Sequence, residues 1–380
     1  MEVSQSLHHD PRVAIGELQA RAPMPADLVL VFGSIGHFMQ GGLDEALRRA
    51  YPGAHLLGCS TAGEISAAGV EDGSCVITVI RFADSEARAA STTLAEMSDS
   101  FAAGERIGAE LAAPGLRAIM VFGPGVNING SALVDGIVAR VGTDVPICGG
   151  LAGDGGAFAR TWVLGDSGMG DQTIAAVGLF GDGLRFGHGS FGGWEPFGPA
   201  RKVTRCENNV LFELDGESAL AVYKRYLGEH ARDLPSSGLL FPFAMVGADL
   251  TGVGLIRTIL GIDESAGSLT LAGAIDPEGY LKLMHATSDG LVSGAEAAAE
   301  AARKMQFSAA PSLAVLVSCV GRKLVMGDRI DEEVEAVVDV FGSGATVAGF
   351  YSYGEISPLM ADGRCHLHNQ TMTIAWIGEG

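Results

Sequence analysis

The stretch GCSTAGE at residues 58–64 recurs in related form as CGGLAGD at 148–154 and as GFYSYGE at 349–355. Each copy ends in a glycine that is followed by aspartate or glutamate. An apolar run of strand length stands before each copy, and another follows it. This recurrence indicates that one structural unit is repeated three times along the chain.

Each unit has the pattern strand, helix, strand, sharp turn, strand. In the first unit the apolar runs at 28–34 and 75–82 are typical of buried strands, and Leu43, Ala46 and Leu47 have the spacing of a helix that packs on a sheet. A strand, a helix and a parallel strand form a right-handed crossover. The sequence therefore predicts an α/β fold in which the strand-helix-strand-turn-strand units form mixed sheets in two domains.

The region between the second and third units has a different residue pattern, which predicts α+β elements. Residues 186–228 begin with glycines and aromatic residues and end in a helix-like segment. Residues 241–287 alternate between apolar and polar positions, with turn signals between the runs, which predicts antiparallel strands. The alanine-rich segment 294–305 predicts a helix.

Charge and composition exclude several classes of function. The 380 residues carry a formal net charge of -20, so a nucleic acid or an anionic membrane would repel the protein. The apolar runs are shorter than the roughly 18 residues needed to cross a bilayer, and the first residues lack the pattern of a secretory signal. The six cysteines show no CxxC pair, which favours reduced thiols and a cytoplasmic protein without membrane insertion.

The carboxylates that end the three turns allow several interpretations. A phosphate-binding loop would carry a lysine after its second glycine, where this chain has Glu64, Asp154 or Glu355. A nucleophile at Cys59 or Ser60 would need a base, and no histidine is tied to the motif. The structural interpretation is that glycine permits the turn and the carboxylate caps nearby amides. Because the residues around the turns differ between copies, a functional specialisation of one copy stays open.

The combined motifs resemble those of FIST domain proteins. The resemblance rests on GCSTAGEI, GGLAGD, LDGESALAVYKRYLG, SCVGR, GFYSYGEI and HLHNQTM, which occur in the family's order along nearly the whole chain. It implies a FIST N-terminal domain with two units over 27–219. It also implies a C-terminal domain over 220–380 with a β-meander, a helix and the third unit.

The resemblance implies a sensory function in bacterial signal transduction rather than an enzyme. The expected partners are a small-molecule or gas ligand, a separate histidine kinase or another signalling protein of a cyclic-di-GMP pathway, and a second copy of the chain. The chain is also similar to the nitric-oxide-sensing haem proteins of this class, which implies haem b as the cofactor. The alternative ligand is an organic metabolite such as an amino acid, bound without haem.

The candidate ligand-binding residues come from the turns, from two arginines and from the HLHNQ segment: Cys59, Ser60, Thr61, Glu64, Arg257, Arg322, Tyr351, Tyr353, Glu355, His368 and Asn369. An arginine among apolar residues is usually paired with a carboxylate, for which Glu355 is the candidate. Otherwise the guanidinium is available to the carboxylate of a small ligand.

Haem needs an axial ligand, usually an imidazole nitrogen, beside an apolar pocket. The candidate axial ligands are His188, which lies near Phe191 and Trp194, then His368 and His37. A competing class is an enzyme acting on a small metabolite, in which Glu64, Asp154 or Glu355 would be the general acid or base. The sequence has no close pairing of a nucleophile with a base, which argues against that class.

Overall fold

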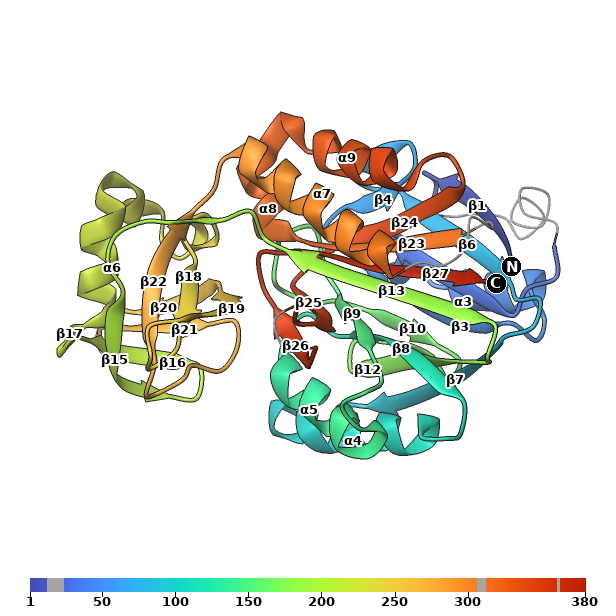
Figure 1. The fold of residues 1–380 in the computed structure, drawn as a ribbon, viewed down its shortest axis with the longest axis horizontal. Coiled ribbons are helices and arrows are strands. Elements are labelled where there is room, and N and C mark those ends of the chain that lie inside the picture. Colours follow the sequence, from blue (N-terminus) through green and yellow to red (C-terminus); the bar gives the residue numbers. More distant parts are fainter. Residues whose placement is uncertain (12–23, 306–311, 361–362) are drawn as a thin grey trace.

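A computed structural model describes residues 1–11, 24–305, 312–360 and 363–380, apart from the side chain of Val253. The unit expected from the sequence occurs three times (Figure 1). In every copy the first strand is parallel to the second and antiparallel to the third. The mixed α/β fold and the threefold repeat are therefore confirmed.

The three copies have corresponding elements. The first contains β2 (Leu28–Gly33), α3 (Leu43–Ala50), β3 (His55–Ser60) and β6 (Cys75–Arg81). The second contains β8 (Leu116–Gly123), α5 (Gly130–Val141), β9 (Ile147–Leu151) and β12 (Thr173–Phe180). The third contains β23 (Ser312–Cys319), α9 (Asp331–Phe341), β24 (Ala345–Ser352) and β27 (Met372–Glu379).

Strands from outside each copy widen its sheet on both sides. One added strand pairs with the third strand of the copy, namely β1 (Glu2–His8) with β6, β7 (Glu86–Thr93) with β12, and β13 (Leu184–Phe191) with β27. The hairpin after each glycine-rich turn joins the second strand of another copy. These hairpins are β4 (Glu64–Ser66) with β5 (Gly69–Glu71) on β24, β10 (Val163–Gly165) with β11 (Gly168–Gly170) on β3, and β25 (Gly354–Pro358) with β26 (Cys365–His368) on β9. The exchange closes a cycle, so the three six-stranded sheets are interlocked.

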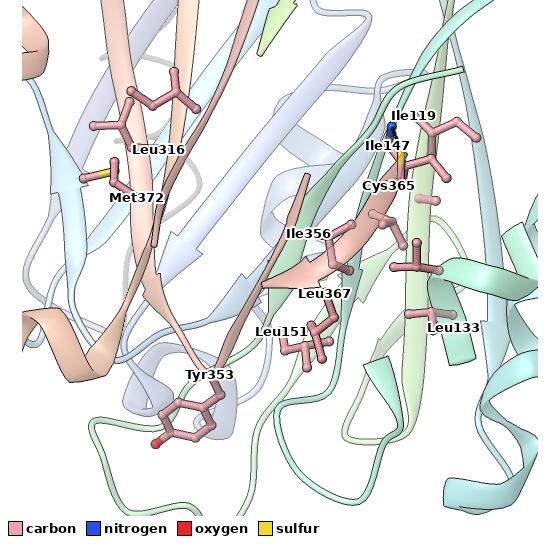
Figure 2. Packing of buried hydrophobic residues seen from close by; sticks show 14 of the residues in the cluster. Ile119, Leu133, Ile147, Leu151, Leu316, Tyr353, Ile356, Cys365, Leu367 and Met372 are labelled. Atoms are coloured by element: carbon pink, nitrogen blue, oxygen red, sulfur yellow. Dashed lines mark hydrogen bonds between the residues drawn. The ribbon is translucent and has the colours of Figure 1, made fainter. Parts of the chain in front are cut away.

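The exchanged hairpin β25–β26 is held by apolar packing. Ile356 and Leu367 of the hairpin lie beside Leu151 of β9, with Leu133 of α5 close by (Figure 2). Full burial of one such side chain contributes about 1.5–3 kcal/mol. The packing fixes the HLHNQ segment against the second copy.

A glycine in each second strand allows the parallel strands to pair. A Cβ atom on Gly58 would lie 2.1 Å from the carbonyl oxygen of Val31, and one on Gly149 would lie 1.9 Å from that of Val121. On Gly349 the corresponding distance is 2.0 Å. The glycines of the three motifs are therefore required by close backbone approach.

Three phenylalanines meet where the sheets face one another. The ring centroids of Phe32 and Phe350 lie 4.9 Å apart, and each ring lies 5.5 Å from that of Phe122. All three rings are fully buried. The centre of the interlocked sheets is thus an apolar core.

Further helices cover the sheets. They are α2 (Ile35–Met39), α4 (Ser100–Leu111), α7 (Ser288–Lys304) and α8 (Val320–Met326), with short 3₁₀ helices at Met97–Asp99, Gly228–Asp233, Ser236–Leu239 and Gly327–Arg329. The alanine-rich helix is confirmed as α7. It begins earlier than predicted because the Thr287 hydroxyl accepts the N–H of Gly290 and caps it. No helix within the described ranges is long and apolar enough to span a membrane.

Residues 195–285 form an insert between β13 and α7, lying to one side of the interlocked sheets (Figure 1). Its sheet is antiparallel, as predicted. The strands are β14 (Glu195–Pro196), β15 (Arg201–Glu207), β16 (Val210–Leu214), β17 (Glu217–Ser218), β18 (Phe243–Val246), β19 (Gly252–Arg257), β20 (Ile259–Asp263), β21 (Ser268–Leu271) and β22 (Tyr280–His285), and α6 (Ala219–Leu227) packs on them. Two chain segments, before β14 and after β22, connect this insert to the rest, which we call the body.

Candidate functional site

The turn of the third copy holds Glu355 in a closed set of hydrogen bonds. One carboxylate oxygen accepts the hydroxyl of Ser352 at 2.7 Å, and the other accepts the N–H and the hydroxyl of Thr371 at 3.1 and 3.0 Å. The side chain has no exposed surface, and burial raises its pKa to about 7. Glu355 therefore ties the turn to the start of β27.

The turn of the first copy repeats this arrangement. Glu64 accepts the hydroxyl of Thr61 on one oxygen, and the N–H and hydroxyl of Ser74, directly before β6, on the other. Burial again raises the pKa to about 7, and the residue is 1% exposed. The first and third copies thus have the same hydrogen-bonding scheme. It agrees with the interpretation that the carboxylate of each turn caps nearby amides.

The second copy is arranged differently. The hydroxyl of Tyr353 and the backbone N–H groups of Phe158, Ala159 and Arg160 all donate to the carboxylate of Asp154. Burial raises the pKa of Asp154, but these donors outweigh it and leave the pKa below its ordinary value. The Tyr353 ring stacks on Phe158, with the ring centroids 4.0 Å apart. The carboxylate of Asp154 therefore orders the loop that follows β9.

Cys59 and Ser60 are enclosed as well. Cys59 lies in the core between the sheets, where burial raises the pKa of its thiol. The Ser60 hydroxyl donates to the carbonyl of Gly153 and accepts the N–H of Trp162. Both residues hold the first and second copies together, and neither side chain is exposed.

Arg322 is paired, although not with the residue that the sequence suggested. Its guanidinium binds the carboxylate of Glu333 through Nε at 3.1 Å and Nη2 at 2.7 Å. Tyr351 donates its hydroxyl to the other oxygen of Glu333. The expected pairing with Glu355 was wrong because Arg322 lies in α8, beyond the end of β23, where it faces the first turn of α9.

Arg257, at the end of β19, is buried without a carboxylate. Nε donates to the carbonyl of Ala274 at 3.1 Å, and Nη1 donates to the carbonyls of Ile256 and Leu367, both at 3.2 Å. Over the described part of the chain, Nη2 has no acceptor and no carboxylate pairs with the guanidinium. The residue is 4% exposed, and burial lowers its pKa to about 10. It remains a cation at neutral pH.

The guanidinium of Arg257 forms part of the wall of a cavity of about 320 Å³ between the insert and the body. The insert contributes Met245, Arg257, Ala274, Ile275 and Asp276, and the body contributes Ser131, Asp135, His366 and Leu367. We call this space the Arg257 cavity. Its size is at the lower end of the range of small-molecule sites, about 300–1,000 Å³.

Further polar groups of both signs surround the Arg257 cavity. Asp135, one turn after Ser131 on α5, is exposed, and partial desolvation raises the pKa of its carboxyl group. The hydroxyl of Ser131 is buried and has no partner among the described residues. A cation, carboxylates and a free hydroxyl therefore face one small space, which suits a ligand that carries both charges.

The HLHNQ segment connects this cavity to the turns. His366 and the carbonyl of Leu367 face the cavity side, whereas His368 is 1% exposed and its Nε2 lies 3.0 Å from the Ser357 carbonyl. Burial lowers the pKa of His368 to about 4, so the ring is neutral and its Nε2–H braces β25. Buried Asn369 has an Oδ1 atom with no partner in the described structure.

Two of the three candidate haem ligands are buried and hydrogen-bonded. His37 and His368 are about 1% exposed and bonded to Ser34 and Ser357. His188 on β13 has a buried Nδ1 without a partner among the described residues, but it is not part of the wall of the Arg257 cavity. Nor do the described ranges contain a cluster of metal-ligating side chains.

The sequence pointed to Arg257 but missed the residues opposite it. Arg257 stood out as a charge in an apolar stretch, whereas no pattern in the sequence distinguished Asp135 from the other acids of the chain. The one available signal was the spacing of Ser131 and Asp135 by four residues, which places both on one side of α5. Which strand packs against that side of α5 depends on the exchange of hairpins between the copies.

Comparison with known proteins identifies the family. The FIST N domain matches residues 27–217, and the FIST C domain matches residues 219–358. No curated protein sequence matches the chain. Among solved structures, the crystal structure of a cyanuric acid hydrolase from A. caulinodans aligns with a TM-score of 0.36 at 10% identity, covering 100% of this chain and 99% of the other, which is too weak to support an argument. FIST domains are sensory domains of signal transduction, and this chain belongs to the FIST family.

Proposed function

We propose that the protein senses a small organic ligand that binds in the Arg257 cavity through its carboxylate. The observation that carries the proposal is a buried guanidinium with three carbonyl acceptors and no carboxylate partner in the described structure. A buried cation is costly unless an anion compensates it. A ligand carboxylate at Nη2 would supply that anion through a charge-assisted hydrogen bond.

The acidic side chains around the cavity favour a ligand that also carries a positive group. Asp135 and Asp276 are the acids of the cavity, and Ser131 offers a hydroxyl. An amino acid, with its carboxylate toward Arg257 and its ammonium toward Asp135, matches these charges. An enzyme with Glu64 or Glu355 as acid or base is disfavoured, because both carboxylates are sealed from solvent and fully bonded within the protein.

The position of the cavity suggests how binding becomes a signal. Its walls belong to two parts of the molecule, so a bound ligand bridges the insert and the body. Such a bridge shifts the equilibrium between their arrangements by the ligand's differential affinity for each. We propose that a separate protein, a histidine kinase or an enzyme of a cyclic-di-GMP pathway, reads the arrangement.

Haem-based sensing of nitric oxide stays a prediction. Its most direct support would be a Soret band of protein purified from haem-supplied cells, shifted by nitric oxide and lost in His188→Ala. The present geometry gives greater support to an organic ligand.

The proposed ligand class can be tested by thermal unfolding in a panel of amino acids and small carboxylates. A ligand that binds only the folded state raises the midpoint of unfolding. Each carboxylate is paired with its amide, which keeps the shape and removes the charge. We expect at least one carboxylate to raise the midpoint where its amide does not, and Asp135→Asn to reduce the effect of amino acids. Equal effects of acids and amides, or no effect of any, would overturn the proposal.

A further inference from the structure

A second cavity, of about 480 Å³, lies on the other face of the strands β19–β18–β22. Leu281 and Leu283 of β22 point into the core of the insert, so Lys282 and Met284 point to the opposite face. The wall is completed by the segment that enters the insert. We call this space the Lys282 cavity; its wall comprises Gly192, Gly193, Trp194, Pro196, Ala200, Ala244, Met245, Val246, Leu250, Gly252, Gly254, Leu255, Ile256, Lys282 and Met284.

The lining is apolar except for one charge. Trp194 provides a ring, Met284 provides an adaptable thioether, and Leu250 at the rim is 63% exposed. The charged member is Lys282, which is half-buried. A lysine in such a place buries its aliphatic stem along the apolar wall and presents its ammonium group to the space.

Lys282 also differs from the other lysines of this acidic chain. The remaining four each form an ion pair with a carboxylate, Lys202 with Glu278, Lys224 with Glu264, Lys304 with Glu300 and Lys323 with Asp72. Lys282 has no carboxylate partner among the residues that the structure describes. With 45 acidic and 25 basic residues in the chain, a lysine without such a partner is notable.

We propose that the Lys282 cavity is a second ligand site, which takes an organic anion with an apolar body, such as a medium-chain carboxylate. The apolar body lies against Trp194 and Met284, and the carboxylate binds the ammonium group of Lys282. The size and the lining are those of small-molecule sites, which are mostly apolar with a few polar groups that fix orientation.

The location of this site connects it to the contact between insert and body. Gly192 accepts a hydrogen bond from Arg322, and the indole N–H of Trp194 donates to the carbonyl of Gln370 at 2.8 Å. The side chain of Gln370 in turn donates to Leu239 and Thr258 of the insert at 2.9 and 3.1 Å. An occupant of the Lys282 cavity therefore touches the segment that joins the two parts.

The two cavities also share a wall residue, because Met245 lines both. The side chain of Met245 lies on the core face with Leu281, so a ligand that shifts β18 from one face changes the space on the other. The second site would thus modulate the first, and by linkage each ligand would change the affinity for the other by the same factor.

Calorimetric titration with decanoate, below the concentration at which it forms micelles, tests the proposal. The wild-type protein is compared with Lys282→Met, which keeps the length of the side chain and removes the charge. Lys304→Met is the matched control, because Lys304 is an exposed lysine on α7. We expect one decanoate per chain, at least tenfold weaker binding to Lys282→Met, and unchanged binding to Lys304→Met.

Two further arms separate this site from the Arg257 cavity and from surface adsorption. Asp135→Asn, which alters only the Arg257 cavity, should leave decanoate binding unchanged, and Ala244→Phe, which fills the Lys282 cavity, should abolish it. Decylamine should not bind. Absence of saturable decanoate binding to the wild type, equal binding to Lys282→Met, or equal binding of decylamine would overturn the proposal.

Discussion

Arg322 and Arg257 are both buried arginines, but among the described residues only Arg322 has a carboxylate partner. Arg322 shares Glu333 with Tyr351, and its remaining donors bind the carbonyls of Gly192 and Leu291. Within the described structure Arg257 donates to three backbone carbonyls, and it faces a cavity. A guanidinium whose charge is compensated inside the protein stabilises a packing arrangement, whereas one without such compensation can bind an anion from solution.

The largest expected effect comes from breaking the internal pair. Glu333→Gln leaves Arg322 buried without a carboxylate, and loss of one partner of a buried ion pair costs about 3–5 kcal/mol. We expect the free energy of unfolding, measured by urea denaturation, to fall by that amount. The matched control is Glu332→Gln, at an exposed position on the same helix. Similar losses of unfolding free energy in Glu333→Gln and Glu332→Gln would show that the Arg322–Glu333 pair contributes no more to stability than an exposed pair.

The pH dependence of stability tests the raised pKa of Glu355, the carboxylate in the turn of the third copy. The pKa of Glu355 is raised from about 4.5 in the unfolded chain to about 7 in the folded one. The folded state therefore holds a proton that the unfolded state loses between pH 4.5 and 7. The stability that this proton provides is complete below the lower pKa and is lost as the pH rises through the upper one.

We expect Glu355→Gln to remove about 1 kcal/mol per pH unit from the slope of the free energy of unfolding in that window. His368, whose folded pKa is about 4, acts in the opposite direction, but it is unchanged in the variant. Chemical denaturation at several pH values measures the slope. Identical slopes for the variant and the wild type would contradict the assignment.

A smaller effect should follow from giving Arg257 the kind of partner that Arg322 has. Ala274 lies in the wall of the Arg257 cavity and is exposed, so Ala274→Asp places a carboxylate near the guanidinium. We expect the affinity for a carboxylate ligand to fall by about 1 kcal/mol or more, roughly fivefold, because the internal anion competes. Ala274→Asn is the control for shape. If Ala274→Asp and Ala274→Asn bound the ligand equally well, the proposed difference between Arg257 and Arg322 would be contradicted.

Local pattern predicted the repeat but not the way in which its copies interlock. Gly58, Gly149 and Gly349 are required where two parallel strands approach closely, so the motifs themselves contain this information. Pairing of β25 with β9 joins segments about 200 residues apart, and nothing in either segment encodes its partner. The walls of the Arg257 cavity depend on that pairing, which is why Asp135 was missed.

The arginines show the same limit. Both stood out because charges are rare in apolar surroundings, and one carboxylate partner was expected. Glu355, nearby in the motif, is instead bound by hydroxyls of its own copy, and Glu333 of α9 compensates Arg322. A sequence shows that a buried charge needs compensation, but the distance to each acid decides which one provides it.

The measurement that tests the central claim most directly is a calorimetric titration of the best carboxylate of the panel into the wild type, Arg257→Met and Arg205→Met. Arg205 is an exposed arginine of the insert and serves as the matched control. Loss of a hydrogen bond to a charged group costs about 1.5–3 kcal/mol, so Kd should rise roughly 10- to 150-fold in Arg257→Met and stay unchanged in the control. A folded Arg257→Met protein that binds the ligand as tightly as the wild type would contradict the account.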